Sequence, residues 1–158
     1  MNLLEHLETA QKSIFRFEYL QEFLVPGEET SLKRFEETGE VDVSDMGEWW
    51  SFLKSLHAKG VRTERVRLVR EPQTRYTTCE LLVHKKSVEQ GDDIRVLKEK
   101  DLTPDLERLG DFWLVDDKIV LRMNYSPSGE YLGFEEVADT ASYVAAREYL
   151  WAHALPLA

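Results

Sequence analysis

Residues 111–125 read DFWLVDDKIVLRMNY, and this stretch decides the fold. The four apolar residues from Phe112 to Val115 predict a buried strand, and the acidic pair Asp116-Asp117 predicts a tight turn. After the turn, apolar side chains recur at every second position from Ile119 to Tyr125, which is the period of a strand. We therefore predict that a central β-hairpin organises the rest of the chain.

Further strands and helices are expected on both sides of this hairpin. A third strand with Leu132 and Phe134 follows the turn at 126–129, and a last helix begins at Asp139 or Thr140 and ends before Pro156. Upstream, the pattern predicts a strand over 61–70, a helix from Thr74 or Thr77 to Gly91, a strand over 93–98 and a short helix from Thr103 to Gly110. The N-terminal part is expected to contain a short helix with Leu3 and Leu7, a strand over 15–19, a chain break at Pro26-Gly27, a helix over 28–38 and a helix ended by Gly60.

Two helices carry more detailed expectations. Asp45 and Glu48 have the spacing of a capping box ahead of the helix that contains Trp49. In the helix after Thr74, an apolar stripe is expected to carry Tyr76, Cys79, Leu82 and Val83.

The order of these elements predicts an α/β (α+β) fold in which helices flank a mixed sheet. At 158 residues the chain can bury one core, so we expect residues 1–158 to form a single domain.

Composition restricts the expected cellular location, disulfides and cofactors of the protein. The N-terminus has neither a basic leader nor a hydrophobic signal segment, and no apolar run is long enough to span a membrane, so we expect a cytoplasmic protein. One cysteine, Cys79, excludes an internal disulfide and is expected to pack as a buried thiol. No cofactor motif is present, and we expect no cofactor.

The charge of −10 is unevenly distributed. Residues 61–100 carry more basic than acidic side chains, whereas the segments before and after them are acidic. Because the phosphate backbone of DNA repels an acidic protein, we predict no direct DNA binding and place any anion site in the middle segment.

Arginines dominate that middle segment. They are Arg62, Arg65, Arg67, Arg70 and Arg75. Their planar guanidinium groups either pair with carboxylates such as Glu18, Glu71 and Glu80 or form an anion or phosphate site, and we favour internal pairing.

We predict that any ligand site is formed by residues of this segment and of the hairpin turn. The predicted site residues are Arg65, Arg67, Arg70, Tyr76, Asp116 and Asp117.

Metal and histidine sites are weighed as less favoured alternatives. Five carboxylates, Glu71, Asp92, Asp93, Asp116 and Asp117, could supply oxygens to a hard cation, but ordinary turn chemistry explains the aspartate pairs and we predict no metal site. The four histidines lie on separate helices or helix ends with no shared motif, which argues against a site built around histidine.

Several segments resemble an uncharacterised bacterial family, a domain of unknown function encoded beside small helix-turn-helix regulators. The resemblance is carried by four segments: Phe15 to Glu18, Arg65 to Val69 with Glu71-Pro72, Thr74, Tyr76 and Glu80, Gly91 to Leu97, and Asp111 to Asp117. It implies a regulatory or signalling role and a helix-turn-helix regulator as partner.

A second resemblance is to the half-domain of the phospholipase D superfamily, whose third strand carries His-x-Lys-x-x-x-x-Asp. Counting back from Asp116 places Leu109 and Asp111 at the histidine and lysine positions, and counting from Asp117 places Gly110 and Phe112 there. A phospholipase D-like half-fold, preceded by N-terminal helices, would therefore lack the nucleophile.

These observations favour a non-enzymatic cytoplasmic regulatory or interaction domain. One alternative is a hydrolase or transferase in which Arg67 and Arg70 hold a phosphorylated substrate and Glu71 or Asp116 is the base. Another alternative is a nucleic-acid-binding protein. Trp50 lies off the apolar stripe of its helix, where it is available to a partner or to a second copy of the chain in a homo-oligomer.

Overall fold

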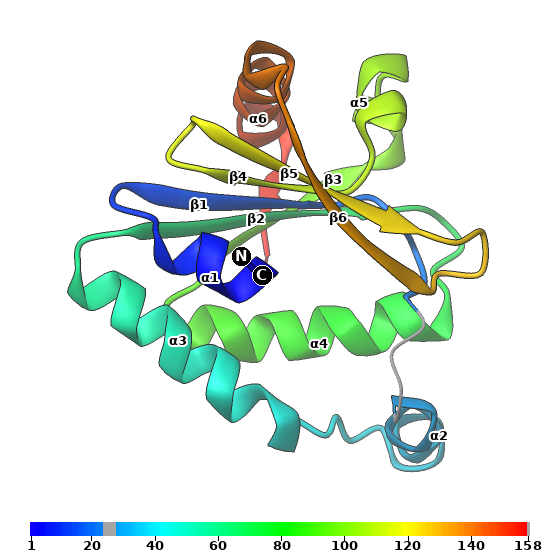
Figure 1. Ribbon diagram of the computed structural model, residues 1–158. Coiled ribbons are helices and arrows are strands. Elements are labelled where there is room, and N and C mark those ends of the chain that lie inside the picture. Colours follow the sequence, from blue (N-terminus) through cyan, green and yellow to red (C-terminus); the bar gives the residue numbers. More distant parts are fainter. Residues whose placement is uncertain (24–27, 158) are drawn as a thin grey trace.

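The computed structural model describes residues 1–23 and 28–157 and contains a mixed β-sheet with helices on both faces (Figure 1). The strands are β1 (Ser13–Glu18), β2 (Arg62–Val69), β3 (Asp93–Lys98), β4 (Phe112–Val115), β5 (Ile119–Tyr125), β6 (Tyr131–Val137) and β7 (Leu155–Pro156). The helices are α1 (Leu3–Glu8), α2 (Glu28–Thr38), α3 (Gly47–Ala58), α4 (Arg75–Glu89), α5 (Pro104–Leu109) and α6 (Thr140–His153), with 3-10 turns η1 (Ser44–Met46) and η2 (Glu99–Asp101).

The described strands form one sheet in the order β6-β5-β4-β1-β2-β3-β7. Strands β1, β2 and β3 run parallel to one another, and every other pairing between these strands is antiparallel. The predicted mixed sheet flanked by helices is therefore confirmed. Within the described ranges, no helix is both long and apolar enough to cross a lipid bilayer.

The predicted hairpin is formed by β4 and β5, which pair in antiparallel register. Asp116 and Asp117 both have a φ of 55°, a left-handed conformation that aspartate tolerates better than most residues. The backbone N–H of Lys118 closes the turn by donating to the carbonyl of Val115 at 2.9 Å. Strand β4 continues the sheet to β1, which is its central strand. The chain break expected at Pro26-Gly27 lies outside the described residues.

Alternation along the strands gives the sheet two apolar surfaces. Phe15 of β1 packs with Tyr143 of α6 on the face that α5 and α6 cover. Ile14 and Trp113 lie in a second buried cluster with Leu56 of α3, on the face that α1, α3 and α4 cover (Figure 1). Apolar side chains are therefore buried on both faces of the sheet.

The second face becomes charged where α4 crosses it. The side chains of Glu18, Arg65 and Arg67 are 6%, 13% and 0% exposed there. Helix α4 directs a polar stripe at this surface, and the buried or partly buried members of that stripe are Thr77, Glu80, His84 and Ser87.

The apolar stripe predicted for α4 is therefore wrong in part. Tyr76 is buried, but Cys79, Leu82 and Val83 are only partly buried. The sheet beneath α4 carries charges, and buried charges require polar partners, so polar residues occupy the inward positions.

The capping box predicted at Asp45 is also wrong. Helix α3 begins at Gly47, and its N-cap residue, Met46, makes no side-chain capping bond. Asp45 lies inside η1, and the carboxylate of Asp42 instead accepts a hydrogen bond from the backbone N–H of Ser44 at 2.9 Å. The 3-10 turn moves the start of the helix past the expected cap.

The last helix begins and ends as predicted. Asp139 caps α6 by accepting from the backbone N–H of Ser142 at 3.2 Å, and Pro156 lies past the end of the helix. Leu155 and Pro156 form a strand that was not predicted, β7, at the edge of the sheet beside β3. An edge position tolerates proline because one side of the strand needs no donor.

We predict that Trp113→Ala lowers the free energy of unfolding by about 3–5 kcal/mol, because the change deletes a large aromatic from a buried strand. Trp113 is 6% exposed, and its ring centre lies 5.9 Å from that of Trp49. Urea denaturation followed by circular dichroism measures the loss. Leu132→Ala is the control, since Leu132 is 62% exposed. Equal midpoints for the two variants would contradict the prediction.

Candidate functional site

A cavity of about 350 Å³ lies between α2, α3 and α4 and the charged part of the sheet. Aromatic and aliphatic side chains form much of its wall, among them Leu32, Met46, Trp49, Tyr76, Val83 and Trp113. Six carboxylates also line it, namely Glu18, Glu28, Asp42, Asp45, Glu80 and Asp92. The basic groups among the described lining residues are Arg65 and His84, so the cavity carries an excess of negative charge.

Glu18 is the innermost of these carboxylates. It is the last residue of the central strand β1 and is 4% exposed. Its Oε1 accepts from Arg65 Nη1 at 2.9 Å and from His84 Nε2 at 2.9 Å, and its Oε2 lies 3.9 Å from Arg67 Nη1. Three cationic side chains therefore converge on one buried carboxylate.

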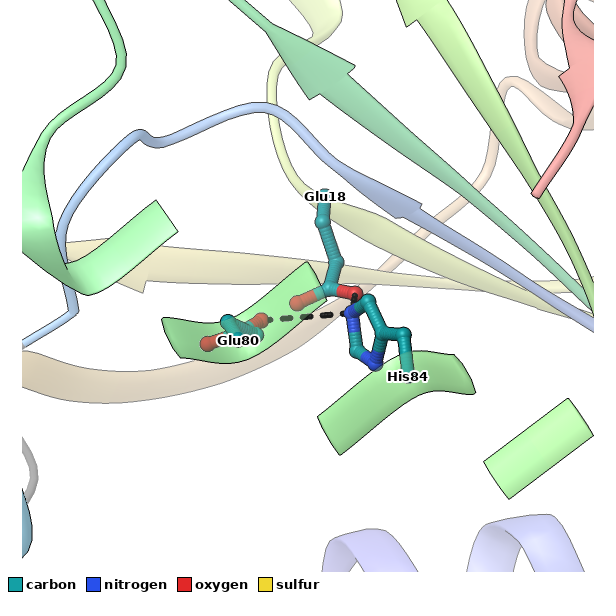
Figure 2. Close-up of side chains that lie close together, drawn as sticks. All are labelled: Glu18, Glu80 and His84. Atoms are coloured by element: carbon teal, nitrogen blue, oxygen red, sulfur yellow. Dashed lines mark hydrogen bonds and ion pairs between the residues drawn. The ribbon is translucent and has the colours of Figure 1, made fainter. Parts of the chain in front are cut away.

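Helix α4 supplies the opposite wall. Thr74 caps the helix by accepting from the backbone N–H of Thr77 at 3.1 Å, which fixes where the helix begins. Tyr76, Glu80 and His84 follow at intervals of four residues and share one side of the helix. Figure 2 shows Glu80 and His84 on α4 directed at Glu18 on β1, with His84 Nε2 3.4 Å from Glu80 Oε1.

Burial and mutual attraction set the charges of this group. Burial alone would lower the pKa of His84, but the neighbouring Glu18 and Glu80 carboxylates raise it to about 9. Burial opposes ionisation of Glu18 as well, yet Arg65 and His84 hold the pKa of that carboxyl well below its usual range. At neutral pH Glu18 is therefore a carboxylate and His84 an imidazolium.

Arg65 is held from several sides. Its Nη1 pairs with Glu18, and its Nε lies 3.9 Å from Asp92. The guanidinium also lies over two rings, with its central carbon 5.4 Å from the Trp113 centroid and 6.0 Å from the Trp49 centroid. This arginine is a fixed part of the cavity wall.

Glu28 is the carboxylate with the most unfavourable surroundings. Burial, reinforced by the charge of Glu80, raises the pKa of Glu28 to about 7. The same causes, burial first and then Glu28 and Glu80, raise the pKa of the Cys79 thiol. The cavity therefore resists further negative charge.

The structure brings two of the predicted site residues, Arg65 and Tyr76, into this cavity. Arg67 lies beneath it, completely buried, and donates to the backbone carbonyls of Leu20 and Gln21 at 2.5 and 3.1 Å. The ion pairs of Arg65 and Arg67 with Glu18 are of the internal kind that the sequence favoured, whereas the carbonyl contacts of Arg67 were not predicted.

Arg70 is placed elsewhere. It pairs with Glu99 at 2.6 Å and with Glu107 at 3.6 Å, and it donates to the hydroxyl of Tyr19 at 3.1 Å. It does not line the cavity.

Asp116 and Asp117 lie at the far end of β1 from Glu18. The Asp116 carboxylate accepts from the backbone N–H groups of Gln11, Lys12 and Ser13, at 2.7 to 3.1 Å. Six residues of strand separate this point from the cavity by roughly 17–20 Å. Asp116 thus anchors the start of β1, and neither turn aspartate lines the cavity.

Sequence reasoning did not identify the histidine at the centre of the site. Glu18 and Glu80 were considered only as partners for arginines, and His84 was treated as isolated. The available signal was the spacing of Glu80 and His84, which places them on one side of a helix. Glu18 joins them only through the packing of α4 on β1.

One group in the described residues has the composition of a metal site. Glu18, Glu80 and His84 each offer a ligand atom, and these atoms all lie within 4.8 Å of one another. None of the five carboxylates weighed from the sequence as metal ligands belongs to this group.

We predict that Glu28→Gln stabilises the protein increasingly as pH rises. Because the folded state holds the Glu28 proton up to about pH 7, whereas the unfolded chain releases it near 4.5, wild-type stability falls across this window, and an amide avoids that loss. The melting temperature of the variant should therefore exceed that of wild type at pH 8 by more than it does at pH 4.5. Glu37→Gln, an exposed change on the same helix, is the control. A difference that does not grow with pH would contradict the assignment.

Comparison with known proteins places the chain in a family. A family model described as "Domain of unknown function (DUF6879)" matches residues 2–158. No curated protein matches the chain. Since the match spans nearly the whole sequence, the chain belongs to this uncharacterised family.

Proposed function

We propose that this protein is a non-enzymatic regulatory or interaction domain whose cavity binds a cationic group, either an ammonium or a guanidinium. The observation that carries the proposal is the excess of carboxylates over basic groups in an aromatic-walled cavity. Carboxylates and aromatic faces both attract cations, and the attraction grows where water is excluded.

The basic groups that line the cavity do not neutralise all of its carboxylates. Arg65 and His84 are both paired to Glu18. Burial, reinforced by the charge of Glu80, raises the pKa of Glu28 to about 7, so this carboxyl keeps its proton to about that pH. A bound ammonium or guanidinium would favour ionisation of Glu28 and gain a charge-assisted hydrogen bond from it.

The size of the cavity suits a single small group. Its volume of about 350 Å³ is at the lower end of the range for small-ligand pockets. A free amine and the side chain of a lysine or arginine on a partner protein share the required chemistry. Experiment therefore has to distinguish a free amine from a basic side chain of a partner protein.

The absence of an activated nucleophile among the described cavity residues supports binding over covalent catalysis. Burial raises the pKa of Cys79, which keeps the thiol protonated. Burial and the charge of Glu80 likewise raise the pKa of Tyr76, which keeps the phenol protonated. His84 and Glu18 are paired with each other, and neither is a free base.

The alternative of a phosphorylated substrate has less support. A phosphate clamp requires accessible guanidinium groups that share one site, but Arg67 is completely buried and Arg70 is paired with two glutamates outside the cavity. Asp111, one residue at the lysine position of the phospholipase D pattern, lies 3.3 Å from Arg16 and accepts from the backbone of Tyr19 at 2.9 Å. We propose that a phospholipase D-like half-fold in this chain binds a ligand and does not cleave phosphodiesters.

A helix-turn-helix regulator fits as the partner because such proteins are basic on the face that contacts DNA. The chain carries a charge of −10, and the cavity concentrates acidic groups from several segments. We propose that a basic side chain of the regulator enters the cavity.

Titration calorimetry tests the cationic ligand. We expect arginine amide and lysine amide to bind, and citrulline amide, which matches arginine in shape but is neutral, to bind at least about tenfold more weakly because a charged hydrogen bond is lost. The double variant Glu28→Gln, Asp45→Asn should weaken arginine amide binding by roughly tenfold. The double variant Asp105→Asn, Glu130→Gln removes the same charge from exposed positions and should bind as wild type does.

Equal binding of arginine amide and citrulline amide would contradict the proposal. Tight binding of inorganic phosphate, lost in Arg65→Gln, would favour the alternative.

A gel shift tests the source of the cation. The protein should release a neighbouring helix-turn-helix regulator from its operator and should not shift the operator alone, since a charge of −10 repels DNA. The Glu28→Gln, Asp45→Asn variant should release less regulator than the surface double variant does. If only free amines bind and the regulator stays on its operator, the ligand is a small molecule. Submicromolar operator binding by the protein alone would support direct DNA recognition.

A further inference from the structure

The three side chains in Figure 2 have a geometry beyond that of an ordinary ion pair. His84 Nε2 lies 2.9 Å from Glu18 Oε1 and 3.4 Å from Glu80 Oε1, so a single ring nitrogen faces two carboxylate oxygens. Glu18 and Glu80 come from β1 and α4, which are far apart in sequence. Their oxygens and the histidine nitrogen all lie within 4.8 Å of one another.

These separations are close to those of a metal coordination shell. Zinc binds imidazole nitrogen and carboxylate oxygen at about 2.0–2.2 Å, so ligands at tetrahedral angles lie about 3.3–3.6 Å apart. The 3.4 Å from His84 Nε2 to Glu80 Oε1 lies in this range, and the 2.9 Å to Glu18 Oε1 is shorter, so an ion would have to separate these two atoms. An ion placed among the three atoms would require small movements of side-chain ends and no change in the backbone.

The scaffold around the three ligands is rigid on two sides. Glu80 and His84 are one turn apart on α4, whose start is fixed by the Thr74 cap. Glu18 ends the central strand, and Arg65 Nη1 holds the same carboxylate at 2.9 Å. Groups that orient the ligands in this way raise metal affinity in known sites.

We propose that Glu18, Glu80 and His84 bind one divalent transition-metal ion, with Zn²⁺ as the best fit. Because a metal ion binds the lone pair of neutral imidazole, binding at Nε2 would release the His84 proton to solvent. One imidazole and two carboxylates suit zinc or manganese better than magnesium, which prefers an all-oxygen shell. All three ligands line the cavity, so the remaining coordination position faces it. The site is distinct from the cationic-group function proposed above and does not depend on it.

Calorimetry with ZnCl₂ in a non-coordinating buffer, without any amine, tests this site. We expect one zinc ion per chain, weaker binding of Mn²⁺ and the weakest binding of Mg²⁺. Glu80→Gln and His84→Gln keep a hydrogen-bonding side chain of similar size but remove a ligand, and each should weaken zinc binding by at least about tenfold. Glu148→Gln and His153→Gln, matched changes on exposed positions of α6, should bind zinc as wild type does.

X-ray absorption at the zinc edge of the wild-type protein tests the ligands without any substitution. The expected first shell contains imidazole nitrogen and oxygen at about 2.0–2.2 Å. A sulfur at about 2.3 Å would assign zinc to Cys79 and overturn the proposal. Wild-type-like zinc binding by Glu80→Gln or His84→Gln, or no stoichiometric binding by wild type, would also overturn it. Since no amine is present, a negative result leaves the arginine amide experiment unaffected.

Discussion

The polar half of this molecule depends on one buried carboxylate, that of Glu18. Arg65, Arg67 and His84 all lie within 4 Å of its oxygens, and each is itself largely buried. Taking so many charges out of water is expensive, and the cost is acceptable only while every charge has an opposite partner. Replacing Glu18 by a neutral residue would leave three cations around an uncharged side chain. The position of α4 on the sheet is tied to this balance, because His84 is the residue through which that helix contacts Glu18.

The two faces of the sheet differ in what they bury. On the face covered by α5 and α6, Phe15, Phe17 and Phe112 pack with Tyr143 in a closely packed aromatic cluster. Such burial supplies most of the free energy of folding. The opposite face can then hold charged groups beneath α4 without forfeiting stability. A cavity over the part of this face that carries Glu18 of β1 and Arg65 of β2 follows from this division.

The features that sequence predicted well are those set by neighbouring residues. The hairpin, its aspartate turn and the alternation of Val66 with Arg65 and Arg67 need only local geometry, and all are present. The pairing of Arg65 with Glu18 was one of several carboxylate pairings expected for the arginines of this segment, and the sequence did not choose among them. The stripe of α4 was misread because its inward residues depend on what the sheet presents, and that is fixed by register between distant segments. The approach of His84 to Glu18, 66 residues away, is not encoded in any local pattern.

The net charge of a sequence segment did not indicate the charge of the cavity that the segment lines. Residues 61–100 are net basic, which suggested an anion site, yet the cavity beside Arg65 is lined by Glu18, Glu28, Asp42 and Asp45 from the acidic N-terminal segment. The electrostatic potential at a site is the sum over all nearby charges, and folding here places acidic groups of one segment against the basic groups of another. The arginines are neutralised from within, and the surplus that remains is negative. That surplus is the common physical basis of both proposals, an organic cation and a metal ion bound in the same cavity.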